Sequence, residues 1–128
     1  TRFVEINIKN APSRMQGVRV GRRIASSTLL KTCIYGQDPN WGRIAGSLGT
    51  SGIRIKADRF DIYLGRTQVV KNGVTLNAGK DQLRNIFSGN KDKTIEITVD
   101  LKLGGASATV WTCDLTEEYV KINAEYET

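Results

Sequence analysis

The chain has 128 residues, of which 39% are hydrophobic and 25% are charged. A chain of this length and composition folds as a single domain, residues 1–128, that buries roughly two-thirds of its unfolded surface. It contains no apolar run near the roughly 20 residues of a membrane span and no leader sequence, so we expect no membrane partner and no secretion. A formal charge of +6 would suit nucleic acid, an anionic substrate or solubility alone.

The chain has two cysteines and no histidine. Cys33 and Cys113 match no metal-binding spacing, and no histidine can complete a zinc site, so we expect two buried free thiols and no metal. The missing histidine also excludes Ser-His-Asp and Cys-His mechanisms within this chain. Any catalysis would have to use a carboxylate, a lysine, a terminal amine or groups on another chain.

The beginning of the chain predicts a strand and then a helix. Val4, Ile6 and Ile8 alternate with polar residues, which is typical of a strand with one buried face. Ser13 and Gln16 have the spacing of a capping box, which predicts a helix start. The buried face of this helix is expected to consist of Gly17, Val20, Ile24 and Thr28.

Four arginines lie opposite that predicted buried face. We interpret them as a solvated polar face, because no aromatic residues interleave with them to form the stacking platform of a single-strand nucleic-acid binder. Gly17 and Gly21 on the other side would let the helix approach a sheet closely. The arginines are Arg14, Arg19, Arg22 and Arg23.

The next segment predicts a short strand at 31–35 and a helix that ends at Gly49. Asp38 would cap this helix and Pro39 would be its first residue. The glycine-rich run 46–52 matches neither dinucleotide-binding nor P-loop spacing, so we interpret it as a helix end followed by a turn.

The second half of the chain predicts strands and turns around one further helix. Strands are expected at 60–64 and 69–76, and Asn72-Gly73 is a strong hairpin signal. Apolar residues at 83–87 have helical spacing. A strand at 95–103 and, after a Gly-Gly pair, another strand complete the pattern. Helices mixed with hairpins favour an α/β (α+β) domain over an all-β one.

Single residues in this pattern have structural interpretations. Trp41 and Trp111 are expected to be core anchors, and Arg43 a structural ion-pair partner. The last residues of the chain are apolar and aromatic almost to the end, which predicts a tail that is packed against something.

Two segments resemble one known family. They are the hexapeptide 38–43 (DPNWGR), which follows 31–36 (KTCIYG), and the tail 113–128. Together with the pattern at 94–114 they resemble the C-terminal part of the ornithine/glutamate N-acetyltransferase family of arginine biosynthesis, over essentially the whole chain. Two long motifs in the same order are far more specific than a lone glycine pattern.

The resemblance implies an acyltransferase that is made as a precursor and cleaves itself at an Ala-Thr bond into an α chain and a β chain. The new N-terminal threonine takes acetyl from N2-acetyl-L-ornithine as an ester and passes it to L-glutamate in a ping-pong cycle. Its own α-amine, with an ordinary pKa of about 7.7 to 8.0, can serve as the base. This chemistry needs neither histidine nor a cofactor. Whether acetyl-CoA is a second donor stays open.

The implied fold consists of layered mixed sheets flanked by helices, and this chain would be its C-terminal portion. The implied partners are the missing α chain and the N-terminal part of the β chain. The assembly would be a cytoplasmic heterotetramer of two α and two β chains, without nucleic acid.

The resemblance also implies which residues contact substrate. Thr1 begins a predicted strand that resembles an internal strand of the family, so the nucleophile, oxyanion pair, catalytic lysine and a substrate-binding glutamate are expected upstream. This chain would then contain no catalytic residue and would be inactive alone. Asn123 and Thr128 match an asparagine and a final residue that bind substrate, and both side chains offer hydrogen-bonding groups. Without the family, a turn asparagine and a frayed end would explain them.

A different function class stays open beside this one. The net charge would also fit a non-enzymatic basic module that binds an anionic macromolecule. Its binding would weaken steeply with salt, because phosphate binding depends on counterion release.

Overall fold

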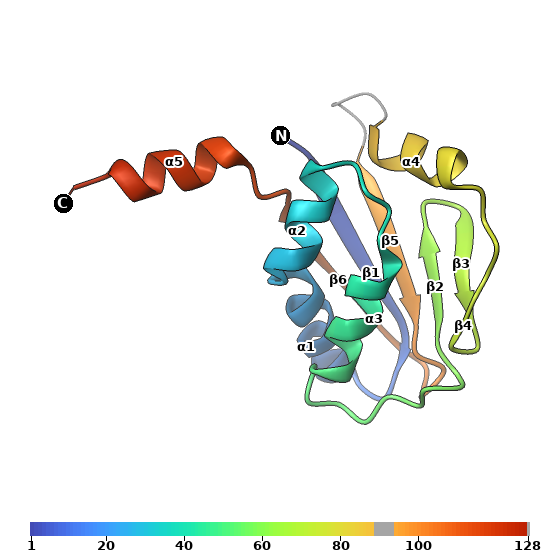
Figure 1. Cartoon of the computed structure of the whole chain (residues 1–128). Helices are drawn as coiled ribbons and strands as arrows, with labels where there is room; N and C mark the ends of the chain where they lie inside the picture. The colour runs from blue at the N-terminus through green and yellow to red at the C-terminus, as the bar shows by residue number, and fades with distance from the viewer. Residues whose placement is uncertain (89–93, 128) are drawn as a thin grey trace.

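The computed structural model describes residues 1–88 and 94–127. It consists of a six-stranded sheet, helices that pack against the sheet, and a last helix that extends away from it (Figure 1). In chain order the elements are β1 (Phe3–Ala11), α1 (Arg14–Ala25), α2 (Thr28–Tyr35), α3 (Trp41–Gly49), β2 (Asp61–Leu64), β3 (Thr67–Lys71), β4 (Val74–Thr75), α4 (Lys80–Ser88), β5 (Ile95–Asp100), β6 (Ala106–Cys113) and α5 (Glu117–Glu125).

The sheet is mixed, with the strand order β4-β3-β2-β5-β1-β6. β1 pairs with β5 in parallel and with β6 antiparallel, and the other pairs are antiparallel. β5 and β6 are consecutive in the chain but lie on opposite sides of β1, so the Gly104-Gly105 turn does not form a hairpin. A mixed sheet with helices confirms the α/β class.

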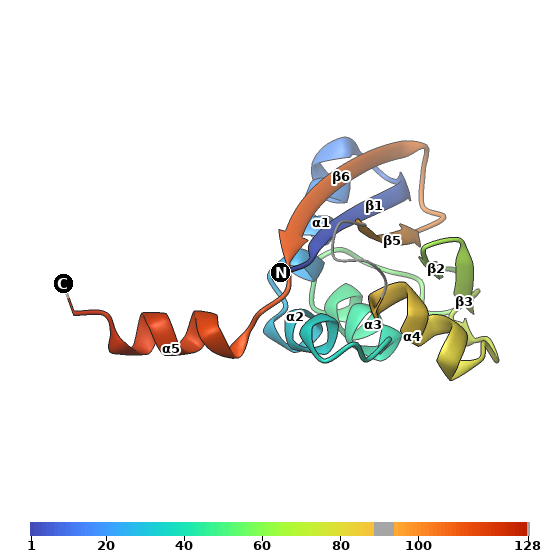
Figure 2. The ribbon, with the colours of Figure 1, turned by 90° about the horizontal axis from the view of Figure 1, so that it is seen from above.

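The helical layer covers one face of the sheet, as the view from above shows (Figure 2). Val4, Ile6 and Ile8 of β1 are buried on that face, which confirms the predicted alternation. α1 approaches the sheet closely at Gly21, where an added Cβ would lie 2.8 Å from Cγ2 of Val110. The prediction that small residues allow close packing of this helix is therefore confirmed.

The start of α1 is as predicted, but its end is not. Ser13 caps the helix, and its Oγ accepts a hydrogen bond of 3.1 Å from the backbone N–H of Gln16. The helix ends at Ala25, so Thr28 is not on its buried face, which is a correction. Ser27 caps a new helix at this point through a 3.2 Å bond from the N–H of Leu30.

Residues 31–35 form part of helix α2, so the predicted strand is wrong. Leu30, Cys33 and Ile34 are the buried residues of this helix, and their spacing is helical. An apolar run this short fits both the two-residue period of a strand and the 3.6-residue period of a helix, so the pattern alone cannot distinguish them.

The helix after Pro39 begins two residues later than predicted. Its first residue is Trp41 and its cap position is Asn40, which makes no side-chain cap bond. Asp38 is therefore not the cap; its backbone N–H instead donates to the carbonyl of Cys33 at 2.9 Å. α3 ends at Gly49, as predicted.

Of the single-residue interpretations, some are confirmed and some are wrong. Trp41 packs against the core, but Trp111 is 58% exposed, because it lies on edge strand β6 and on the face that no helix covers. Cys33 is buried, and burial raises the pKa of its thiol, whereas Cys113 is exposed. Arg43 forms no ion pair within the described residues; it donates to the backbone carbonyl of Leu29.

The predicted Asn72-Gly73 hairpin is confirmed between β3 and β4. Both turn residues have positive φ, 49° at Asn72 and 75° at Gly73, as the two-residue hairpin with matching twist requires. A Cβ on Gly73 would also lie 1.8 Å from the carbonyl oxygen of Ala57. This glycine is therefore required both by backbone conformation and by space.

We expect Gly73→Ala to lower the free energy of unfolding by about 2 to 4 kcal/mol, because it combines an unfavourable φ with a backbone clash. The measurement is urea unfolding monitored by far-UV circular dichroism. Gly105→Ala is the matched control, since an added Cβ there has no neighbour within 4 Å and φ is not positive. Equal midpoints for both variants would contradict the prediction.

Candidate functional site

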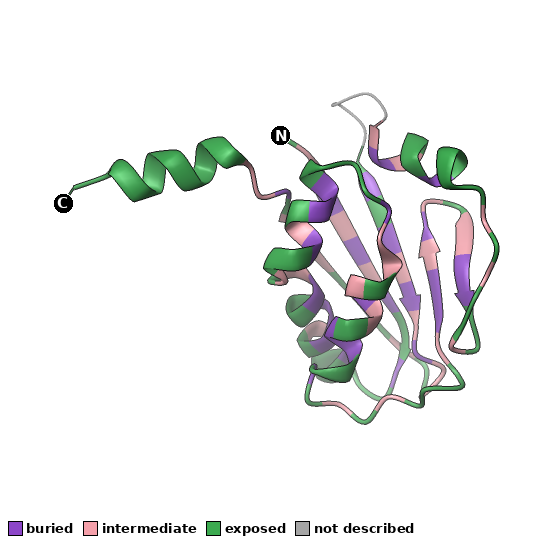
Figure 3. Cartoon of the chain, in the orientation of Figure 1, coloured by how far each residue is buried: buried purple, intermediate pink, exposed green. Residues whose placement is uncertain are grey.

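The tail of the chain forms helix α5, which has no buried residue (Figure 3). Its start is well defined locally: Thr116 caps the helix through a 3.0 Å bond from the N–H of Tyr119, and Glu117 and Glu118 favour the positive end of the helix dipole. The expected packing of the tail is found only at its start, where Asp114 is buried and bonded to Thr1; no residue of α5 is buried by the described part of the chain. Any surface that covers α5 must come from elsewhere.

One side of α5 is an exposed apolar stripe. Tyr119 and Ile122, together with Tyr126 directly after the helix, are spaced at i, i+3 and i+7, and they are 59%, 56% and 71% exposed. Asn123 lies within this stripe, because it is four residues after Tyr119. Its Nδ2 donates a 2.8 Å hydrogen bond to the carbonyl oxygen of Tyr119, which leaves its Oδ1 as an acceptor. Thr128, the other expected substrate contact, lies outside the described residues.

Thr1 is held by a buried carboxylate rather than placed beside a base. Its ammonium lies 2.7 Å from Oδ1 of Asp114, and its hydroxyl donates to the other oxygen. The N–H of Arg2 donates to the same Asp114 at 2.9 Å. Burial alone would raise the pKa of Asp114, but the bonds from Thr1 and Arg2 outweigh burial and lower it.

A cavity of about 380 Å³ lies between the segment 38–42 and helix α4. Its walls combine apolar and charged side chains, which is the composition of small-molecule pockets. The lining residues are Asp38, Pro39, Asn40, Trp41, Gly42, Lys80, Leu83 and Arg84. The hexapeptide that carries the family resemblance therefore faces a helix that is about 40 residues further along the chain.

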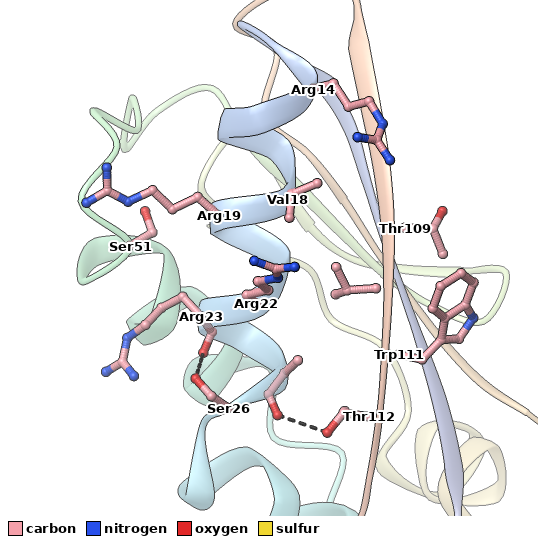
Figure 4. A pocket seen from close by; sticks show the side chains of 12 residues that line it. Arg14, Val18, Arg19, Arg22, Arg23, Ser26, Ser51, Thr109, Trp111 and Thr112 are labelled. Carbon is pink, nitrogen blue, oxygen red and sulfur yellow. Dashed lines mark hydrogen bonds between the residues drawn. The ribbon is translucent and has the colours of Figure 1, made fainter.

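The four predicted surface arginines of α1 are exposed, as expected, and they line a wide groove of about 860 Å³ (Figure 4). β6 forms the other side of the groove, so the fold brings Trp111 near the arginines, which the sequence did not reveal. However, the Trp111 side chain is on the side of β6 that faces away from α1 (Figure 4). Its Nε1 donates a hydrogen bond of 3.3 Å to Oε1 of Glu5. Arg23 is bound to Thr50 Oγ1 at 3.0 Å.

Residues 1–88 and 94–127 contain no helix long and apolar enough to cross a membrane. They also contain no group of three or more histidine, cysteine or acidic side chains that could hold a metal ion.

The fold is that of an arginine-biosynthesis protein of known structure. The crystal structure of arginine biosynthesis bifunctional protein ArgJ from Bacillus halodurans matches with a TM-score of 0.94 and 32% identity, over 98% of this chain and 58% of that chain. The model of the ArgJ family matches residues 1–128. The chain belongs to the ArgJ family.

Curated relatives agree along the whole chain. Arginine biosynthesis bifunctional protein ArgJ of Thermotoga neapolitana is 40% identical over 100% of this chain and 32% of its own length. The chloroplastic ArgJ of Oryza sativa subsp. indica is 41% identical over 100% of this chain and 28% of its own length. The chain thus spans about a third of the length of these relatives.

Proposed function

We propose that the chain is the C-terminal part of the β chain of a glutamate N-acetyltransferase that transfers acetyl from N2-acetyl-L-ornithine to L-glutamate. The observation that carries the proposal is the match of the whole chain to the ArgJ family, whose curated relatives are named arginine biosynthesis bifunctional proteins.

The proposed reaction has two acyl transfers. The threonine hydroxyl attacks the acetyl carbonyl, the C–N bond to ornithine breaks, and the hydroxyl proton passes to the leaving amine. The glutamate amine then attacks the acetyl ester, and the threonine hydroxyl is regenerated. Acetyl-CoA could enter at the first step instead, with its thiol as the leaving group. The nucleophile and its oxyanion donors would be supplied by the rest of the protein.

The part of this chain in the proposed site is its tail. The exposed stripe on α5 supports docking of this helix on the rest of the same protein, because three large apolar side chains on one face have no cover in the described structure. Docking would carry Asn123 to a substrate pocket, where its amide would bind the ammonium or carboxylate of the amino acid. Thr128 would add a second polar contact.

The proposed assembly is the heterotetramer of two α and two β chains that the resemblance implies. A cytoplasmic location stays a prediction, since relatives from plants are named chloroplastic. The test of the proposed function is formation of N-acetylglutamate from N-acetylornithine and glutamate by the full-length, self-cleaved protein.

In that full-length protein we expect Asn123→Ala to raise the barrier, measured from kcat/KM, by about 1 to 3 kcal/mol for both ornithine release and glutamate acetylation. The cause is a lost polar contact that leaves a buried substrate group unpaired. Asn85→Ala is the control, because Asn85 is exposed on α4 and outside the cavity. Kinetics of Asn123→Ala within twofold of the parent would rule out the contact.

The arginine groove favours a second candidate, a basic module that binds an anionic macromolecule. Arg14, Arg19 and Arg22 are exposed along its wall, and counterion release would make such binding strongly salt-dependent. Trp111 is on the side of β6 away from these arginines (Figure 4), which weighs against a surface where the arginines and a stacking aromatic side chain bind the same strand. Nucleic-acid binding at physiological salt, lost in the triple arginine-to-glutamine variant, would establish this second candidate.

A further inference from the structure

The hexapeptide 38–43 is the most specific motif of the chain, and neither the fold nor the proposed reaction gives it a role beyond structure. In the structure, residues 38–42 of this motif form one wall of the 380 Å³ cavity, and α4 forms the other. Three of the lining side chains are apolar. Pro39 on the first wall and Leu83 on α4 are buried, and Trp41 is half-buried and packs against the core, so both walls are held in place.

The charged groups of the cavity come from both walls. Asp38 stands on the first wall, and Lys80 and Arg84 stand on the second, four residues apart on one side of α4. None of the three side chains has a hydrogen bond or an ion pair with another described residue. Elsewhere in the described structure an acid and a base do pair, since Lys102 lies 3.0 Å from Asp61.

We infer that this cavity binds an acidic amino acid. Two cations and one anion around one cavity complement a ligand with two carboxylates and one ammonium, so Lys80 and Arg84 would take the carboxylates and Asp38 the ammonium. The indole of Trp41 and the side chain of Leu83 would contact the short methylene chain between the charges. The volume is in the range of small-molecule pockets.

The same charges select against other amino acids. A basic amino acid would bring a second cation toward Lys80 and Arg84, which like-charge repulsion disfavours. An amide analogue would leave one cation of the cavity without its carboxylate. A dicarboxylate without an amine would leave Asp38 unpaired. The inference rests on the cavity alone and does not depend on the proposed acetyl transfer.

The test uses the full-length protein labelled with 5-fluorotryptophan and fluorine NMR. The resonance of Trp41 is assigned by its loss in Trp41→Phe, and L-glutamate and L-aspartate are titrated as probes. We expect a saturable shift of this resonance. Arg84→Gln and Lys80→Gln should each weaken the binding about tenfold or more, because each removes a charge-assisted contact. Arg54→Gln is the matched control, since Arg54 is exposed and outside the cavity.

Ligand analogues keep the test independent of how the variants fold. With the parent protein, L-glutamine and glutarate should each bind more weakly than L-glutamate, and L-ornithine should not shift the resonance. Asp38→Asn should remove the preference for glutamate over glutarate. Asn123→Ala should leave the shift intact, which separates this cavity from the proposed contact on α5. No shift with either acidic amino acid, or an unchanged shift in both Arg84→Gln and Lys80→Gln, would overturn the inference, whatever the acetyl-transfer assay shows.

Discussion

The isolated 128-residue chain should form no N-acetylglutamate from N-acetylornithine and glutamate. The chain spans 28% to 32% of the length of its curated relatives, and in the proposed reaction the nucleophile and the oxyanion donors are in the remainder. Electrostatic stabilisation by such donors is usually the largest single catalytic contribution, so a fragment without them keeps at most weak substrate binding. The measurement is mass-spectrometric detection of N-acetylglutamate over many enzyme equivalents.

Addition of the separately produced remainder of the protein is the positive arm of this experiment, and it should restore turnover. Thr1→Ala in the isolated chain is the control for the N-terminal threonine, whose ammonium and hydroxyl are both bound to Asp114. Steady product formation by the chain alone, lost in Thr1→Ala, would make Thr1 the nucleophile and contradict the proposed division of the site.

The strands could be predicted from the sequence because their signal is local. Val4, Ile6 and Ile8 report a buried face by alternation, and the Asn72-Gly73 turn needs only its own positive φ angles. Helix α2 does not follow from its apolar residues, because a run of so few fits both the strand period and the helix period; the local signal that separates the two is the cap at Ser27. The order of the strands in the sheet could not be predicted either, because β6 pairs with β1 and not with β5, the strand before it in the chain.

The candidate sites depend on contacts between distant parts of the chain, so pattern alone could not reveal them. The cavity joins 38–42 to α4, and the groove joins α1 to β6. The exposure of Trp111 follows from its place on an edge strand and an uncovered face, which no local pattern encodes. Asn123 is different: its role was inferred from resemblance, and the structure adds the apolar stripe around it.

That stripe leads to the other prediction with a large effect. In the full-length protein, Ile122→Glu should reduce acetyl transfer more than a hundredfold, because α5 would no longer dock. Ile122 is 56% exposed in the described structure, and we expect it to be buried against the rest of the protein. The change removes that burial and places a charge in an apolar contact, at a cost of about 3 kcal/mol or more. The measurement is turnover together with the association state by sedimentation velocity.

Ala124→Glu is the matched control, because it adds the same side chain to the same helix at a position about 160° from Ile122. It should leave turnover and association near those of the parent. If Ile122→Glu also leaves turnover and association unchanged, α5 is a solvated tail. Asn123 would then not reach the substrate, and other residues would have to complete the proposed site. If both variants fail equally, the helix contacts its surroundings on all sides, and the stripe does not define the docked face.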